Sequence, residues 1–180
     1  KRDLSILSGL NVVLTGIEQA EIILCVGLRD DMVETPPDYA AELQALAARK
    51  LPFLCANPDL IVHRGSQMVW CAGALARDYV MLGGEAVYFG KPYPPVYRAA
   101  LARCALLLPD GAKHPLAIGD GLNTDIRGAN GAGLDALFIA DGIHGEEVEP
   151  YTAEHIADRL AQAGVRAAAL RRRARVSGPS

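Results

Sequence analysis

The sequence predicts an α/β fold in which the strands of a parallel sheet alternate with helices. Short apolar and β-branched runs recur along the 180 residues, and most are followed by an Ala- and Leu-rich segment with helical spacing. Gly, Pro, Asn and Asp mark the boundaries between these segments. Open α/β folds place their sites at the carboxyl edge of the sheet, so the residues that follow each predicted strand are the first candidates for function.

The first part of the chain is expected to form one α/β crossover, in which a strand, a loop, a helix and a second strand are followed by Asn57-Pro58-Asp59. Thr35-Pro36-Pro37-Asp38 is a plausible helix entry because Pro suits the first helical turn. The strands are predicted over residues 11–15, 21–27 and 51–56, with a helix over 39–49.

In the second part, residues 61–70 are strand-like and the helix–strand alternation continues to the C-terminal region. The predicted helices cover residues 71–82, 95–106, 124–132 and 154–170, and the strands cover 87–89, 115–118 and 134–140. We expect an α/β unit in residues 1–68, a second set of elements carrying the ionic residues in 69–150, and a helix with a basic tail in 151–180.

Composition narrows the class of protein. The chain is 51% hydrophobic and 22% charged, which indicates a globular protein rather than a disordered one. A net charge of −3 argues against bulk attraction to nucleic acid. Apolar runs are far shorter than the ~20 residues of a membrane span, and no signal peptide is visible. The four dispersed cysteines are expected to be free thiols in a reducing cytoplasm.

The most informative stretch is an apolar strand that ends at Gly119-Asp120, with a second acid, Asp125, one helical turn later. Carboxylates at the end of a buried strand suit a hard cation such as Mg²⁺, and two of them repel each other unless a cation lies between them. Alternatively, Asp120 caps a helix whose dipole stabilises Asp125. The small-residue helix over residues 126–133 can pack closely against the sheet.

Two further strand ends carry candidate residues. In Gly90-Lys91-Pro92, the ammonium group of Lys91 can hold a phosphoryl group and neutralise a carboxylate, although a single Lys is usually a solvated surface residue. Asn57 and Asp59 flank a proline after a strand, so they either line a substrate pocket or simply form a turn.

Other motifs favour structural interpretations. The glycines of residues 128–133 lie inside a helix rather than at a strand-to-helix turn, so a dinucleotide site is not expected. Asp141-Gly142 is more typical of a turn at a strand end, and His144 is either near the site or an ordinary loop residue. The basic run of residues 166–175 is expected to be solvated.

The order Asn57-Pro58-Asp59, Gly90-Lys91-Pro92 and Gly119-Asp120…Thr124-Asp125 resembles the haloacid-dehalogenase-like (HAD) hydrolase superfamily. It is most similar to class IIA, the NagD-like and phosphoglycolate-phosphatase-like group with a large α/β cap. Residues 83–92 and 142–145 resemble a bacterial subfamily whose substrates are largely unassigned. The resemblance implies a three-layer Rossmann-like core, with residues 1–68 as part of a C2-type cap and residues 69–150 as the C-terminal half of the core.

The resemblance also implies a mechanism. An Asp nucleophile forms an aspartyl-phosphate that water hydrolyses, and the family's small phosphorylated substrates are handled with Mg²⁺. By this resemblance, Asp120 and Asp125 bind or support the metal, and Lys91 orients the phosphoryl group, which makes these three the catalytic candidates. Asn57, Asp59, Lys91, Asn123 and Thr124 are the expected substrate-binding residues.

The chain departs from the family in one respect. No Asp-x-Asp motif occurs in its 180 residues, although this motif carries the nucleophile and the general acid–base of the family. We therefore expect a C-terminal fragment that is inactive alone, whose exposed sheet edge favours homo-oligomers or another association. The alternative is a non-catalytic module that binds phosphate and metal, or a partner, through the retained acidic pocket.

Overall fold

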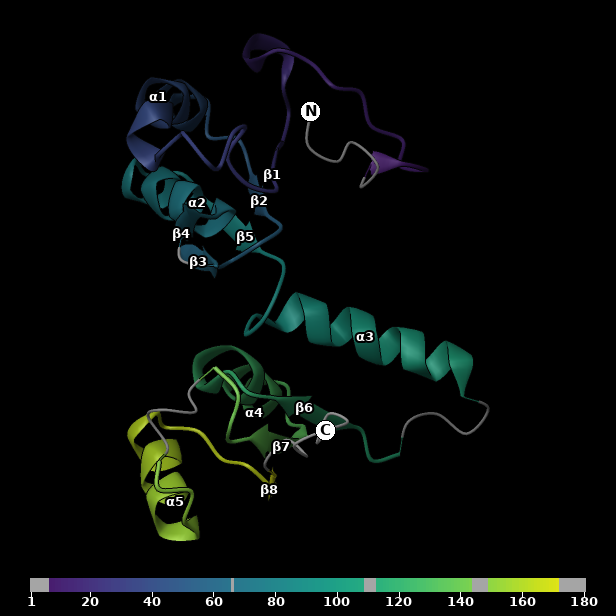
Figure 1. Cartoon of the computed structure of the whole chain (residues 1–180). Helices are drawn as coiled ribbons and strands as arrows, with labels where there is room; N and C mark the ends of the chain where they lie inside the picture. Colours follow the sequence, from purple (N-terminus) through teal and green to yellow (C-terminus); the bar gives the residue numbers. More distant parts are fainter. Residues whose placement is uncertain (1–6, 66, 109–112, 144–148, 172–180) are drawn as a thin grey trace, which may run out of the picture. The chain divides into compact units, whose positions relative to one another are not determined.

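The computed structural model describes residues 7–65, 67–108, 113–143 and 149–171 (Figure 1). The chain divides into two compact units, Lys1–Gly90 and Lys91–Ser180. Each unit contains a three-stranded parallel sheet with helices packed on it, which confirms the predicted α/β class.

The sheet of the first unit has the strand order β1-β2-β5, and its strands run parallel in a continuous register. The buried side chains of the middle strand, Phe53 and Cys55, pack against helices α1 and α2. Tyr79 of α2 is fully buried there, and its hydroxyl donates to the Leu51 carbonyl at 2.6 Å. The elements are β1 (Ile23–Cys25), α1 (Ala40–Ala48), β2 (Phe53–Cys55), α2 (Ala72–Met81) and β5 (Ala86–Tyr88), with short 3-10 turns at Ile17–Gln19 and Pro36–Tyr39.

The predicted division near residue 68 differs from the one in the structure, because helix α2 and strand β5 belong to the first unit. β5 pairs with β2, from Phe53↔Ala86 to Cys55↔Tyr88, and α2 supplies much of the buried cluster. Hydrogen bonding and burial thus tie residues 72–88 to the residues before them, and the compact units divide between Gly90 and Lys91.

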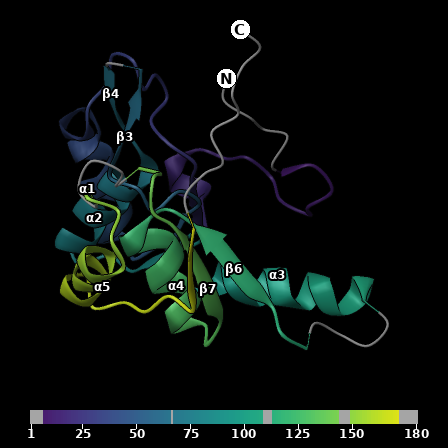
Figure 2. The same ribbon diagram turned by 60° about the horizontal axis from the view of Figure 1, so that its bottom comes forward.

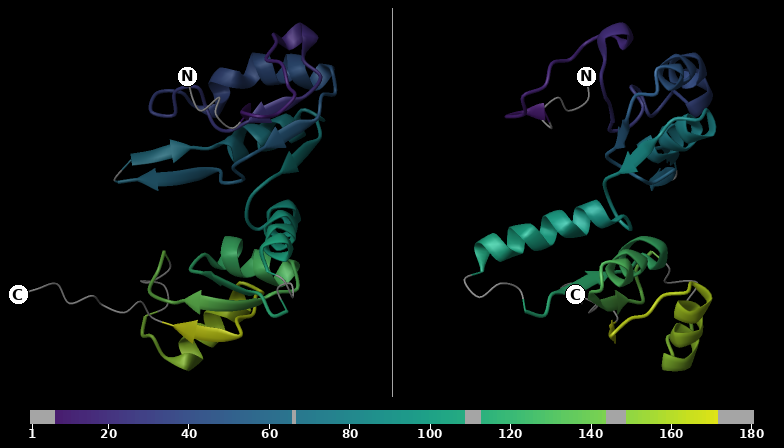
Figure 3. Two further views of the ribbon diagram at one scale, coloured as in Figure 1. Left: turned by 90° about the vertical axis from the view of Figure 1, so that its right-hand side faces the viewer. Right: turned by 180° about the vertical axis from the view of Figure 1, so that it is seen from behind.

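An antiparallel hairpin follows β2. Strands β3 (Ile61–Arg64) and β4 (Gln67–Trp70) pair from Ile61↔Trp70 to Arg64↔Gln67 and form a separate two-stranded ribbon (Figure 3). Val69 is 2% exposed, whereas Met68 is 55% exposed, so only one face of β4 is anchored in the unit.

The second unit has the sheet order β6-β7-β8, again parallel. Helices α4 and α5 pack on one face of it (Figure 2) and enclose a cluster that includes Phe138, Ile126, Ile156 and Leu160. Asn130 of α4 exchanges two hydrogen bonds with the backbone of Arg166, which anchors the segment that leads into β8. The elements are α3 (Pro94–Leu107), β6 (Leu116–Gly119), a π-helical turn (Leu122–Ile126), α4 (Arg127–Gly131), β7 (Asp135–Ile139), α5 (Ala153–Gln162) and β8 (Ala169–Arg171).

Two secondary-structure predictions are wrong. Residues 11–15 form no strand, because they pair with no strand in the described part of the chain, and Val13 is 84% exposed. The helix predicted over 154–170 ends at Gln162, since Gly164 adopts a φ of +64° that leaves the helix, and the chain then turns back to form β8. Among the described residues, no helix has the length and apolar character to cross a membrane.

Candidate functional site

The predicted acids of the second unit lie together at the carboxyl end of β6. Asp120 directly follows this strand, and Asp125 lies in the π-helical turn that comes next. One carboxylate oxygen of Asp125, Oδ2, accepts hydrogen bonds from the backbone N–H groups of Gly121 at 2.9 Å and Asp120 at 3.2 Å. The Asp125 side chain thus closes the loop that carries Asp120, and the two acids are held at one point of the sheet edge.

Lys91 completes this cluster. Its ammonium group donates to Oδ1, the other carboxylate oxygen of Asp125, and forms an ion pair with it. The Asp125 side chain is 12% exposed and that of Lys91 is 55% exposed, so the acid is held inside while the ammonium group remains open to solvent. The hydrogen bond with Asp125 raises the pKa of Lys91 above its usual value, partial burial opposes this, and the charge of Asp120 adds to it. Lys91 is therefore a cation throughout the neutral pH range.

Asp120 is oriented by a different segment. Its Oδ2 accepts a hydrogen bond from the backbone N–H of Ile143 at 3.2 Å, beyond the end of β7. A Cβ atom on Gly142 would lie 2.2 Å from the Cβ of Asp120, so only glycine permits this approach. The Asp141-Gly142 pattern, expected to be a turn, thus also supplies the wall behind the Asp120 carboxylate.

Small residues in the loop make room for the acids. A Cβ on Gly119 would lie 2.3 Å from the Cγ of Asp125, and one on Gly121 would lie 2.2 Å from Oγ1 of Thr124. Asn123 in the same turn accepts a hydrogen bond from Arg127 at 3.0 Å through Oδ1. The structure therefore brings together five predicted residues of this unit: Lys91, Asp120, Asn123, Thr124 and Asp125.

Sequence reasoning missed Tyr97 of α3. Its hydroxyl lies 3.5 Å from the carbonyl oxygen of Thr124 and 3.4 Å from that of Asp125, and its ring packs where a Cβ on Gly128 would otherwise be. Burial raises the pKa of Tyr97, and the charge of Asp125 acts in the same direction. Tyr97 lies in the first turn of α3, and an aromatic residue on a helix carries no distinctive sequence signal.

The other predicted pair, Asn57 and Asp59, lies in the first unit and forms a turn after β2. The Asp59 N–H donates to Oδ1 of Asn57 at 3.2 Å, which is the side-chain turn that Asn favours. The Asp59 carbonyl accepts from the N–H of Gly73 at 3.1 Å, and a Cβ on Gly73 would lie 2.1 Å from the Pro58 carbonyl oxygen. The start of α2 thus fixes this turn.

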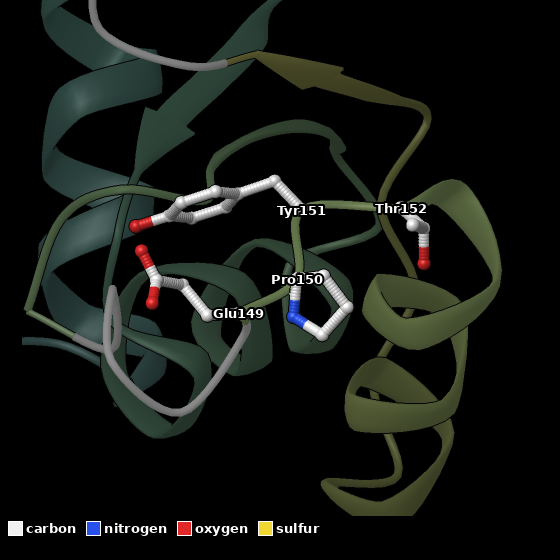
Figure 4. A pocket seen from close by; sticks show the side chains of 4 residues that line it. All are labelled: Glu149, Pro150, Tyr151 and Thr152. Carbon is white, nitrogen blue, oxygen red and sulfur yellow. The ribbon is translucent and has the colours of Figure 1, made fainter.

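Two other features lie apart from this cluster. Glu149, Pro150, Tyr151 and Thr152 line a shallow open hollow ahead of α5, and none of them was a predicted site residue (Figure 4). His144 and the arginines after residue 171 lie outside the described residues, so their predicted roles stay predictions. Within the described ranges, no group of three or more His, Cys, Asp or Glu side chains could hold a metal by itself.

The donor chemistry of the cluster suits Mg²⁺. Asp120 and Asp125 offer carboxylate oxygens, the donors that hard cations prefer, and no thiol or imidazole ligand is present among the residues described at this loop. Mg²⁺ is commonly bound by one or two carboxylates and keeps several waters or substrate oxygens. A pair of acids beside a lysine therefore fits a magnesium-bound phosphate better than a closed metal cage.

Comparison with known proteins shows which family the chain resembles. Residues 88–163 match the family model described as HAD-hydrolase-like. Over this segment the chain is similar to the haloacid-dehalogenase-like hydrolases. It is 29% identical over 113 residues to a dihydroxyacetone phosphatase of Corynebacterium glutamicum (strain R), covering 61% of this chain and 40% of that protein. It is also 30% identical over 91 residues to the ribonucleotide monophosphatase NagD of Escherichia coli K12, covering 51% of this chain and 34% of NagD.

Solved structures support the same assignment. A haloacid-dehalogenase-like hydrolase from Brucella suis 1330 is 49% identical with a TM-score of 0.70, covering 78% of this chain and 53% of that one. A glycerol phosphate phosphatase from Mycobacterium tuberculosis, solved in complex with magnesium, is 27% identical with a TM-score of 0.53, covering 74% of this chain and 39% of that one. The chain spans about half the length of these relatives or less, and the resemblance to NagD-like phosphatases is confirmed.

Proposed function

We propose that this chain carries the metal- and phosphate-binding part of a Mg²⁺-dependent phosphatase that acts on small phosphorylated metabolites. The observation that carries this proposal is the Lys91–Asp125 ion pair, held beside Asp120 at the carboxyl end of β6. The relatives named as dihydroxyacetone, ribonucleotide and glycerol phosphate phosphatases support the substrate class.

Each residue has a distinct proposed role. Asp120 binds Mg²⁺ directly, and Asp125 supports the metal while it holds the loop through two backbone N–H groups. Lys91 places a positive charge where a phosphoryl group would bind and is protonated at neutral pH. Asn123 and Thr124 provide polar contacts to the substrate from the same turn. When bound, Mg²⁺ would neutralise phosphoryl charge.

The remaining chemistry needs a group that these residues do not supply. We propose that an Asp outside this chain is the nucleophile, that it forms an aspartyl-phosphate, and that water hydrolyses this intermediate. The absence of an Asp-x-Asp motif from the 180 residues supports this placement. The same absence supports the second candidate function, a non-catalytic module that binds metal and phosphate.

We further propose that the first unit is cap and the second is the C-terminal half of the core, with the protein in the cytoplasm. Asn57 and Asp59 would then act from the cap side on the substrate. Strand β6 is an edge strand of the described sheet, and its Leu116 and Ile118 are 50% and 65% exposed. An unpaired apolar edge favours association, so we expect oligomers of this chain, and a monomer in sedimentation at all concentrations would contradict that expectation.

Hydrolysis of p-nitrophenyl phosphate tests the function. The 180-residue chain should show no turnover with Mg²⁺, whereas the encoded polypeptide including the residues that precede Lys1 in its gene should show Mg²⁺-dependent turnover. Asp120→Asn should abolish that turnover, and Asp158→Asn, an exposed carboxylate on α5, should retain it. Robust turnover by the 180-residue chain that is lost in Asp120→Ala would disprove an external nucleophile. An inactive longer polypeptide would favour the binding module.

A further inference from the structure

Two cysteines of the first unit face each other across neighbouring strands. Cys25 ends β1 and Cys55 ends β2, and the parallel register pairs these two residues directly. Neighbouring strands lie about 4.8 Å apart. Disulfides join Cα atoms that are about 4.4–6.8 Å apart, so the backbone already brings the two residues within range.

The two side chains also lie on the same face of the sheet. Cys55 is fully buried in the cluster formed with α1 and α2, and Cys25 packs against that cluster while remaining partly exposed. In a parallel pair, residues in direct register point to the same side, so the two sulfur atoms share one environment. Both cysteines are free thiols in the structure.

The environment sets the reactivity of these thiols. Burial raises the pKa of Cys25 to about 11. Burial also raises the pKa of Cys55 to about 12, and the nearby Cys25 thiol acts in the same direction. A thiol with a raised pKa is mostly protonated at neutral pH, so the first attack on an oxidant is slow. Once a mixed disulfide has formed, the fixed position of the second thiol favours formation of the Cys25–Cys55 disulfide over reversal of the first attack.

We propose that Cys25 and Cys55 form a reversible cross-strand disulfide when the protein is exposed to a low-molecular-weight disulfide such as oxidised glutathione. This modification site does not depend on the proposed phosphatase function. In the cytoplasm such bonds are usually transient rather than structural, which fits a pair that is reduced in the resting protein.

The exchange balances in two steps. The thiolate of Cys25, the more accessible of the two, attacks one sulfur of oxidised glutathione, so that a mixed disulfide forms and one glutathione thiolate leaves. The thiolate of Cys55 then attacks the Cys25 sulfur and expels the second glutathione. Two protein thiols lose two electrons in total, glutathione gains them, and the two released protons return to the two glutathione thiolates.

Disulfide formation would also change the loops that follow the two strands. The Cys55 thiol donates to the carbonyl oxygen of Asn57 at 3.2 Å, and the Cys25 thiol makes a longer contact of 3.9 Å to the carbonyl oxygen of Gly27. Both hydrogens are lost on oxidation. The Asn57 carbonyl therefore loses a donor within the turn that leads to Asp59, which couples the redox state of the pair to this turn.

The other two cysteines are built-in controls. Cys71 lies at the start of α2, outside the strand register, and its thiol contacts the carbonyl of Val69 at 3.9 Å. Cys104 lies on α3 in the second unit. Neither residue occupies a position paired with Cys25 in the sheet.

Peptide mapping of the oxidised chain tests the proposal. Trypsin places each of the four cysteines on a separate peptide, which are residues 3–29, 51–64, 65–77 and 104–113. After incubation of the purified chain with oxidised glutathione and alkylation of the remaining thiols, mass spectrometry should find the 3–29/51–64 pair in excess of every other cross-linked pair. Dithiothreitol should convert it back to the two free peptides.

Matched variants sharpen the result. Cys71→Ser should retain the cross-link, whereas Cys25→Ser should lose it and leave Cys55 reduced, because Cys55 depends on Cys25 for its oxidation. The proposal is overturned if the wild-type chain yields only glutathione adducts, or if a Cys55–Cys71 pair predominates. Since the wild-type map alone separates these outcomes, the test stands even where a variant fails to fold.

Discussion

Asp125 should stabilise the second unit far more through the backbone of its loop than through its ion pair. In Asp125→Ala, the N–H groups of Asp120 and Gly121 lose a charged acceptor that is 12% exposed. Hydrogen bonds to charged groups contribute roughly 1.5–3 kcal/mol each. The pair with Lys91 adds only about 0–1 kcal/mol, because the lysine is half exposed and solvent screens the charge.

We therefore expect Asp125→Ala, which removes both bonds, to lower the free energy of unfolding by about 3–6 kcal/mol. For a unit of this size, this corresponds to a fall in Tm on the order of 15–30 °C. Asp125→Asn keeps an oxygen acceptor for the loop and should cost about 1 kcal/mol. Asp158→Ala, an exposed position on α5, is the control and should stay within about 0.5 kcal/mol of wild type.

Thermal unfolding followed by far-UV circular dichroism measures the Tm of each variant, and amide hydrogen exchange locates the effect. The amides of Asp120 and Gly121 should lose protection in Asp125→Ala and keep most of it in Asp125→Asn. If Asp125→Ala unfolds at the same temperature as Asp158→Ala, with both amides still protected, the reasoning about this loop is refuted.

Three further predictions concern packing and charge. Tyr79→Phe should cost about 1–3 kcal/mol in urea unfolding because it leaves the buried Leu51 carbonyl without its 2.6 Å donor, and an unchanged free energy of unfolding would contradict this. Gly73→Ala should cost at least about 1–3 kcal/mol because its Cβ would meet the Pro58 carbonyl, whereas Gly131→Ala, with open space around it, should be neutral or stabilising in the same assay. Folding raises the pKa of Lys91, so the contribution of Lys91 to stability is complete below the usual lysine pKa of about 10.4 and is lost as the pH rises through the higher pKa of the folded state. The Tm difference between wild type and Lys91→Met should therefore be constant from about pH 6 to 9. A difference that grows over that range would contradict a raised pKa.

Much of the fold could be predicted because the pattern and the packing agree. Residues 51–56 and 134–140 read as buried strands, and both became central strands of their sheets. Residues 11–15 have the same apolar, β-branched character but form no strand. A strand needs a neighbouring strand to pair with, and residue composition does not show whether one is available. The compact units divide after Gly90 for a related reason: the pairing of β5 with β2 is a long-range contact that no local signal reports.

The candidate site was predictable to the extent that strand ends converge. Asp120 and Asp125 are close in sequence, and the loop geometry that joins them follows from the glycines around them. The ion pair with Lys91, 34 positions away, did not follow from the topology of one sheet edge, because β5, the strand before Lys91, and β6, the strand before Asp120, belong to different sheets. Tyr97 and the Ile143 N–H were missed because an aromatic residue on a helix and a backbone donor in a loop carry no distinctive sequence signal.

Binding of inorganic phosphate in the presence and absence of Mg²⁺ tests the central claim most directly. Isothermal titration of the 180-residue chain should show phosphate binding that requires Mg²⁺, that is lost in both Asp120→Asn and Lys91→Met, and that is retained in Asp158→Asn, an exposed position on α5. Phosphate binding that needs no Mg²⁺, or that survives both substitutions, would contradict the assignment of this cluster as a metal–phosphate site.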